Sequence, residues 1–351
     1  MDRKQKTPKS EYLHGGDIYR NDVRLDYSVN LNPKRTPDSV YMACMKGLSK
    51  LRHYPDPLQE DLRLAISEMD GVDPSEMVCG NGASEIIMAA VQAFRPGQTL
   101  ITAPCYAGYR EALRACGAEV IEYELREDDG FSLDQGICDH ISEDTGMVFI
   151  GNPNNPNGRL VDEDLLKDIE RTCRESGTVL VIDECFLPLT SLGTSPPVSD
   201  DRALHLRAFT KSFSVPALRL GYAVCRDAEI LSRISAQLPE WNVSLIAQLA
   251  GEAAAKAASG TDFIKESVEY IEEERAFLTE KLSAMDIKVY PSDTNYLLIK
   301  SVPDLYDRLL AEGVLIRRCS NFSGLDDTFF RIAVGTFDDN RELIKILRTV
   351  L

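Results

Sequence analysis

One lysine, Lys211, stands in a segment that is otherwise apolar enough to be buried. The segment reads AFTKSFSVPALRLGY over residues 208–222, and Arg219 follows the lysine after eight residues. Burial of an ammonium group is costly unless the group is paired or loses its proton. Lys211 therefore indicates a chemical role, and the rest of the sequence has to supply its partners.

A glycine-rich turn supplies a possible site for an anion. In CGNGASEIIM, residues 79–88, Gly82 permits close approach of the backbone, and Ala83 and Ser84 begin a predicted helix. Free N–H groups at a helix start bind phosphate well. Taken alone, the segment is better explained as a capped helix after a turn.

Two polar side chains follow predicted strands. Asn155 lies in GNPNNPNG, residues 151–158, where asparagines and prolines force a turn and can hold an amide donor rigidly. Asp183 ends the apolar run VLVID, where a carboxylate is expensive unless a cation meets it. A plain loop explains the first by itself, and a helix cap is the simple alternative for the second.

Together these groups match the needs of one cofactor, pyridoxal phosphate. The cofactor needs an amine for an imine bond, an anion beside its ring nitrogen, a donor to its ring oxygen and a cradle for its phosphate. Lys211, Asp183 and Asn155 supply the first three, and the helix start near Gly82 with Arg219 supplies the fourth. Tyr106, after another strand end, offers an aromatic face to stack on the ring. Each part alone is a weak signal, but the ordered set is specific.

The elements around these residues predict an α/β fold. Apolar runs rich in β-branched residues alternate with helical patterns from about residue 83 to residue 226, which indicates a mostly parallel sheet covered by helices on both faces. Ligands of such sheets gather at the carboxyl ends of the strands. Two helical stretches follow, Leu245 to Ala258 and Asp262 to Met285, and then short strands at 287–291, 294–300, 313–319 and 329–336. The second half of the chain therefore predicts a smaller α+β domain, with a boundary near residue 240.

Composition excludes several classes of function. Thirty-nine Lys and Arg against 56 Asp and Glu give a net charge of −17, which disfavours nucleic acid and anionic membranes as partners. The nine cysteines are scattered without a C-x-x-C pair, as in a reducing cytosol, and no signal peptide or membrane span is visible. The histidines show no metal-ligand spacing. We expect a cytoplasmic protein that takes a small-molecule substrate and no metal.

The order and wording of the motifs resemble the class I/II aminotransferase group of fold-type I pyridoxal-phosphate enzymes over nearly the whole chain. Two families within that group are similar: threonine-phosphate decarboxylase, which serves cobalamin side-chain synthesis, and histidinol-phosphate aminotransferase. HGGDIY near the start and LIRRCSNFSGLDD at 315–327 resemble the decarboxylases most. The resemblance implies an N-terminal arm at 1–33, a large cofactor-binding domain at 34–240 and a small domain at 241–351.

The resemblance also implies a role for each matched residue. Lys211 would form the imine and Asp183 would pair with the ring nitrogen. The remaining cofactor contacts would come from Gly82, Ala83, Ser84, Tyr106, Asn155, Thr210 and Arg219. Tyr54 would reach the cofactor phosphate of a neighbouring subunit, which implies a homodimer with its active site at the subunit interface. Substrate would be bound by His14, Gly15, Gly16, Asn32, Arg317 and Arg331.

Three positions depart from the expected pattern. Phe186 replaces a tyrosine that bonds the ring oxygen in many aminotransferases, and Gly335 stands where the decarboxylases have an arginine. Arg318 stands where an acidic residue is usual, which predicts a more basic substrate pocket. We predict decarboxylation of threonine phosphate to aminopropanol phosphate. The alternatives are a histidinol-phosphate-type aminotransferase using 2-oxoglutarate or glutamate, and a non-catalytic relative that binds the cofactor.

Overall fold

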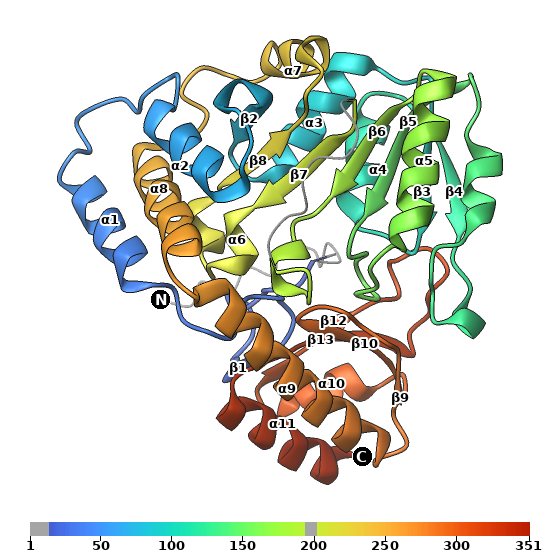
Figure 1. Ribbon diagram of the computed structural model, residues 1–351. Helices are drawn as coiled ribbons and strands as arrows, with labels where there is room; N and C mark the ends of the chain where they lie inside the picture. Colours follow the sequence, from blue (N-terminus) through green and yellow to red (C-terminus); the bar gives the residue numbers. More distant parts are fainter. Residues whose placement is uncertain (1–13, 194–201) are drawn as a thin grey trace, which may run out of the picture.

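The computed structural model describes residues 14–193 and 202–351, and its larger unit is built on a twisted sheet (Figure 1). Within the described residues this sheet has seven strands, in the spatial order β2 (Met77–Gly80), β8 (Gly221–Val224), β7 (Leu204–Ala208), β6 (Val179–Asp183), β5 (Thr145–Gly151), β3 (Gln98–Ala103) and β4 (Glu119–Glu124). Strand β8 runs antiparallel to both neighbours, and the pairs from β7 to β4 are parallel. The predicted α/β fold with a mostly parallel sheet is confirmed.

Helices cover both faces of this sheet because successive strand residues point to opposite sides. Val181 packs on one face, with α3 (Ala83–Phe94), α4 (Ala107–Ala115) and α7 (Ala228–Ser235). Its neighbour Ile182 packs on the other face, with α5 (Glu163–Ser176). Helix α2 (Glu60–Asp70) lies on that second face too, over β2 and β8. Burial on both faces explains the continuous aliphatic run of β6.

The smaller unit is an antiparallel sheet backed by helices. Its strands, in spatial order, are β12 (Arg317–Arg318), β13 (Phe329–Ala333), β10 (Tyr296–Lys300) and β9 (Lys288–Val289). Its core also includes residues of α10 (Leu305–Ala311) and α11 (Phe337–Val350). The N-terminal segment joins this unit: β1 (Leu25–Asp26) pairs in parallel with β11 (Val314–Leu315), and Tyr27 lies in the same core. Residues 1–13 of the predicted arm lie outside the described residues.

The change of packing between the units falls later than the predicted boundary near residue 240. Helix α8 (Leu245–Gly260) packs against α1 (Asp38–Leu48) and α2, and its Ala250 and Ala254 belong to the core over β2 and β8. Helix α9 (Phe263–Ser283) runs from one unit to the other: Ile264 lies in that core, and Leu278 lies in the core of the smaller unit. Small apolar residues let α8 approach the larger unit closely. The sequence of α8 alone does not show which of the two units it packs against.

Short segments connect these elements. They are α6 (Phe209–Ser212) and the 3-10 helices η1 (Pro74–Glu76), η2 (Glu127–Asp129), η3 (Gln135–His140), η4 (Leu187–Leu189) and η5 (Pro216–Leu218). The carboxyl ends of β3, β5, β6 and β7 meet at one edge of the sheet, because these strands are parallel. This edge faces the smaller unit (Figure 1). Within the described residues, no helix combines the length and apolar character that crossing a membrane requires.

Candidate active site

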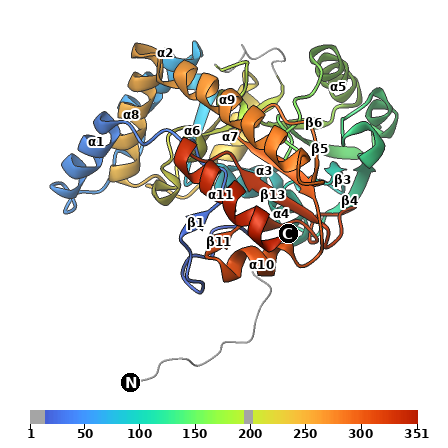
Figure 2. The same cartoon turned by 90° about the horizontal axis from the view of Figure 1, so that it is seen from below.

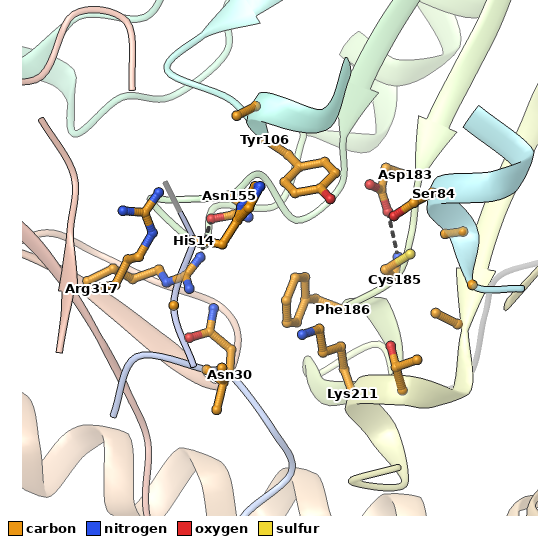
Figure 3. Close-up of a pocket in the computed structure, with 18 of the residues that line it drawn as sticks. His14, Asn30, Ser84, Tyr106, Asn155, Asp183, Cys185, Phe186, Lys211 and Arg317 are labelled. Carbon is orange, nitrogen blue, oxygen red and sulfur yellow. Dashed lines mark hydrogen bonds between the residues drawn. The ribbon is translucent and has the colours of Figure 1, made fainter. Parts of the chain in front are cut away.

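A cavity of about 270 Å³ lies at this edge of the sheet, between the larger unit, the N-terminal segment and the smaller sheet (Figure 3). Most of the residues predicted from the sequence line it. They are His14, Gly15, Gly82, Ala83, Ser84, Tyr106, Asn155, Asp183, Thr210, Lys211, Arg219, Arg317 and Arg331. They come from segments between residues 14 and 331, so only the folded chain brings them together.

Lys211 enters the cavity from α6, the single helical turn that follows β7. Loss of hydration on burial, followed by the positive charges of Arg331 and Arg219, lowers the pKa of Lys211 from 10.5 to about 8. Its Nζ lies 5.7 Å from the centre of the Phe186 ring. The lysine is therefore much closer to its neutral, nucleophilic form at physiological pH than a solvated lysine would be.

Asp183 ends β6, and both of its carboxylate oxygens accept a hydrogen bond. The Tyr109 hydroxyl donates to Oδ2 over 2.7 Å, and the Cys185 backbone N–H donates to Oδ1 over 3.0 Å. Asp183 and Lys211 line the same cavity although they belong to different strand ends. Sequence analysis missed Tyr109, because its position within a helix carried no signal of a polar contact.

Asn155 and Arg331 meet across the two units. The Arg331 Nη1 donates to Asn155 Oδ1 over 2.5 Å, and its Nη2 donates to the Ser28 carbonyl over 3.0 Å. Since its oxygen is occupied, Asn155 presents its amide N–H₂ as the group that can donate to a ligand. This arrangement fits the donor role inferred for Asn155.

An anion cradle forms where β2 passes into α3. Gly82 adopts φ +82°, and a Cβ added there would lie 2.8 Å from Nη2 of Arg219. A Cβ on Gly221 of β8 would lie 2.5 Å from the backbone nitrogen of Ala83. Glycine at both positions therefore lets a guanidinium and a neighbouring strand pack directly against the helix start, where free N–H groups attract phosphate.

Tyr106 forms an aromatic wall of the cavity (Figure 3). A Cβ on Gly108 would lie 2.3 Å from its ring, so the ring folds closely over that glycine. Ser84 of the cradle lines the same cavity as this ring. The aromatic wall and the cradle therefore border the same space.

The far side of the cavity is basic. Arg317 and Arg331 are cross-strand partners on β12 and β13, and both are buried. Burial lowers the pKa of Arg317 to about 10, and the charge of Arg331 contributes in the same direction. Arg317 Nη2 donates to Asn321 Oδ1 over 2.8 Å, and its guanidinium lies 5.1 Å from the centre of the Phe322 ring. Two guanidiniums in one poorly hydrated cavity favour an anionic ligand.

Asn32 was predicted to bind substrate, but the structure places it outside the cavity. Its Nδ2 donates to the Ser212 carbonyl over 2.8 Å and to Ser267 Oγ over 2.9 Å. The asparagine in the cavity is Asn30, which is 1% exposed and whose two side-chain polar atoms have no partner among the described residues. Residues two apart would share one side of a regular strand, so the sequence pattern could not separate them. In the structure a turn at Asn30, where the Leu31 N–H donates to the Val29 carbonyl over 3.2 Å, gives them different surroundings.

Three further positions differ from the predicted cavity. Gly16 lines a smaller adjacent hollow that shares His14, Gly15 and Arg317 with the main cavity. Tyr54 is 78% exposed and packs against Trp241, with ring centres 4.8 Å apart and planes tilted by 34°, and it does not line the cavity of its own chain. Arg318 is absent from the main cavity but lines the adjacent hollow, so a more basic substrate pocket stays a prediction.

Arg318 is the more exposed of the two arginines and lies outside the main cavity, because it alternates with Arg317 along β12. Its Nη2 donates to Asp307 over 2.5 Å, and its guanidinium lies 4.1 Å from the centre of the Tyr306 ring.

The cavity residues fit pyridoxal phosphate. They provide a lysine of lowered pKa, a hydrogen-bonded carboxylate, a glycine and arginine cradle and an aromatic wall, within one α/β cavity. The fold and this set of groups define a pyridoxal-phosphate-dependent enzyme.

Residues 23–347 match the family model for aminotransferase class I and II, and the chain belongs to this family of pyridoxal-phosphate enzymes. The chain is similar to a threonine-phosphate decarboxylase of Salmonella typhimurium, with 33% identity covering 96% of each protein. A solved histidinol-phosphate aminotransferase from Clostridium acetobutylicum superposes with a TM-score of 0.86 at 32% identity, covering 93% of this chain and 98% of that one. An L-threonine-O-3-phosphate decarboxylase from Porphyromonas gingivalis gives 0.79 at 26% identity, with the same coverage.

Proposed function

We propose that the protein decarboxylates L-threonine O-3-phosphate to aminopropanol phosphate, a product that would serve cobalamin side-chain synthesis. The observation that carries this proposal is the cross-strand pair Arg317 and Arg331 facing one cavity. The substrate has two anionic groups, a carboxylate and a phosphate, and guanidinium groups bind both in directional, bidentate fashion. Similarity to the Salmonella decarboxylase supports the same reaction.

Each group then has a part in binding. Arg331, held by Asn155 and Ser28, would receive the carboxylate, and Arg317 with His14 would receive the phosphate. Asn30, whose amide is buried and unpaired among the described residues, would bond the substrate between them. Lys211 would hold the cofactor, Asp183 would pair with its ring nitrogen, and Asn155 would donate to its ring oxygen. The cradle at Gly82, Ala83 and Ser84, with Thr210 and Arg219, would bind its phosphate.

The reaction follows from how these residues orient the substrate. The bound cofactor withdraws electrons from the α-carbon and assists cleavage of the bond that stands perpendicular to its ring. We propose that Arg331 holds the carboxylate in that perpendicular position. The bond from Cα to the carboxylate would then break, carbon dioxide would leave, and the electron pair left at Cα would take up a proton. Lys211 is the group in the cavity suited to deliver this proton.

Histidinol-phosphate transamination is the second candidate, because the Clostridium structure resembles this chain closely. Histidinol phosphate carries one anionic group, so it would leave one of the two arginines without a partner until the second substrate, a dicarboxylate, binds. The retained Lys211 and the family membership exclude the third alternative, a non-catalytic relative, because the chain is an enzyme of this kind.

The test compares the two substrates on the purified holoenzyme. We expect carbon dioxide and aminopropanol phosphate from L-threonine O-3-phosphate, and no turnover in Lys211→Ala. Turnover of histidinol phosphate that depends on 2-oxoglutarate, without release of carbon dioxide from threonine phosphate, would replace the decarboxylase by the aminotransferase.

We also propose that two chains form a homodimer that completes the site. Large apolar side chains are exposed along α1 and the loop after it: Tyr41, Met42, Met45, Leu48, Leu51, Tyr54 and Leu58. Helix α1 packs on α8 by its other side and lies at the edge of the molecule, as Figures 1 and 2 show. An exposed apolar surface of this extent is typical of an interface. Tyr54 lies on it and would reach the phosphate cradle of the partner.

We propose from the state of the cysteines that the protein works in the cytoplasm. All nine cysteines are free thiols in the structure. Free thiols are the usual state in the reducing cytoplasm, and the cytoplasm is where we expect the reaction to take place.

A further inference from the structure

The carboxylate of Asp183 is held by two donors that belong to the protein itself. The Tyr109 hydroxyl donates to Oδ2 over 2.7 Å, and the Cys185 N–H donates to Oδ1 over 3.0 Å. A carboxylate has about four sites for accepting hydrogen bonds, so two remain for a ligand. One donor on each oxygen fixes the rotation of the carboxylate about its side-chain bonds.

Tyr109 is itself held firmly. It lies on α4, is 2% exposed, and its ring stacks on Phe149 with centres 5.0 Å apart and planes 15° apart. The Tyr106 ring meets it edge-on, with centres 5.4 Å apart and planes 85° apart. The position of the hydroxyl is thus set by aromatic neighbours from β5 and from the cavity wall.

The hydroxyl also stays protonated. Burial, followed by the negative charge of Asp183, raises the pKa of Tyr109 well above its ordinary value. Tyr109 is therefore a constant donor to Asp183 and does not act as a base.

We propose that Tyr109 is a positioning residue, whose hydroxyl turns the Asp183 carboxylate toward the ring nitrogen of the cofactor. This inference rests on the proposed pairing of Asp183 with that nitrogen. Without the hydroxyl, one carboxylate oxygen loses its anchor, and the charge-assisted bond to the ring weakens because its geometry is no longer fixed. Cofactor affinity and turnover would fall, while recognition of the substrate's anionic groups by Arg317 and Arg331 would persist.

The test compares Tyr109→Phe with a matched variant, Tyr222→Phe. The Tyr222 hydroxyl also donates to an aspartate over 2.7 Å, at Asp70 Oδ2, and Tyr222 is also buried, but it packs in the core on the opposite face of the same sheet. We expect Tyr109→Phe to raise the dissociation constant of pyridoxal phosphate about tenfold, as the loss of one hydrogen bond to a charged group predicts. It should also lower kcat with KM nearly unchanged and alter the pH dependence of the cofactor's visible absorption.

Tyr222→Phe should lower the unfolding midpoint to a similar extent and leave the cofactor measurements unchanged. Equal effects of the two variants on cofactor affinity and absorption, or no effect of Tyr109→Phe, would overturn the inference.

A cofactor analogue with carbon in place of the ring nitrogen separates this inference from the proposed function. In the wild type, the analogue should bind more weakly than pyridoxal phosphate, and Tyr109→Phe should not weaken it further. Equal weakening of both cofactors by Tyr109→Phe would overturn the role of Tyr109 while leaving Asp183 at the ring nitrogen. Equal affinity of the wild type for both cofactors would instead remove the pairing of Asp183 with the nitrogen, and the inference with it.

Discussion

At the scale of single residues, the lysine in the cavity carries an electrostatic cost. Its pKa of about 8 means that the folded protein releases this proton more readily than the unfolded chain, where the ordinary value is 10.5. The unfolded state therefore binds more protons between these two pH values, and the contribution of Lys211 to stability rises with pH in that window. Below about pH 8 the full cost of the buried ammonium is present.

This cost predicts a pH-dependent effect of Lys211→Met on the protein freed of its cofactor. At pH 7 the variant should be more stable than the wild type by on the order of 3 kcal/mol, because it has no ammonium to bury. The difference should shrink as the pH rises from 8 toward 10.5. Urea denaturation of both proteins at pH 7 and pH 10 measures it, and the other titrating groups cancel because both proteins share them. A difference that stays constant with pH would contradict the prediction.

Asn30 and Asn32 provide a second prediction at this scale. Asn30→Ala should lower kcat/KM for the phosphorylated substrate about tenfold or more, since it removes a buried hydrogen-bonding group from the cavity. Asn32→Ala should instead lower the free energy of unfolding by about 1–3 kcal/mol, because it leaves buried partners at Ser212 and Ser267 unsatisfied. Steady-state kinetics and denaturation of both variants check this. If Asn32→Ala lowered kcat/KM and Asn30→Ala lowered only stability, Asn32 would instead be the residue that binds substrate.

At the scale of elements, the start of α3 depends on the missing side chain of Gly82. Gly82→Ala places a methyl group 2.8 Å from Arg219 Nη2 and strains a backbone at φ +82°. We expect cofactor affinity to fall about tenfold, because the guanidinium has to move and a charge-assisted bond to phosphate is lost.

Gly71→Ala is the matched control for that change. Gly71 has φ +69° and nothing within 4 Å of an added Cβ. Gly71→Ala should lose about 1 kcal/mol of stability at its left-handed backbone and retain normal cofactor affinity. Gly82→Ala should lose more stability, because φ +82° with ψ 159° is a conformation essentially restricted to glycine. Titration of each apoprotein with pyridoxal phosphate distinguishes them, and equal losses of affinity would refute a specific role for Gly82.

At the scale of the whole molecule, the proposed dimer shares its active sites between chains. Lys211→Ala and Tyr54→Phe should each impair activity alone. After subunit exchange, a mixed dimer would hold one site with both native residues, so random mixing should restore up to about a quarter of wild-type activity. A mixture of Lys211→Ala with Arg219→Ala is the control, because both residues line the cavity of the same chain and no native site can form.

Activity should be measured against the extent of subunit exchange. Complete exchange without recovery in the first mixture would show that Tyr54 acts within its own chain or not at all.

The sequence by itself determined the fold class and most of the cofactor site. Asp183 ends a strand, and Lys211, Asn155 and Gly82 each follow a strand within a few residues, so they gather where the carboxyl ends of the strands meet at one edge. The local sequence pattern was therefore enough to predict that these side chains lie close together. Arg317 and Arg331 were expected in the site only from the resemblance to the decarboxylase family, and the structure places both in the cavity.

Only the tertiary structure decided which of several equivalent residues faces the cavity. Asn32 lies outside the cavity because it donates hydrogen bonds to Ser212 and Ser267. Arg318 lies outside it and donates to Asp307. Helix α8 belongs to the larger unit because it packs against α1 and α2. The contact between Tyr109 and Asp183 spans 74 positions of the chain. For Asn32, Tyr109 and α8 the outcome depends on a partner far away in sequence, and the free energy of that contact exists only once the chain has folded.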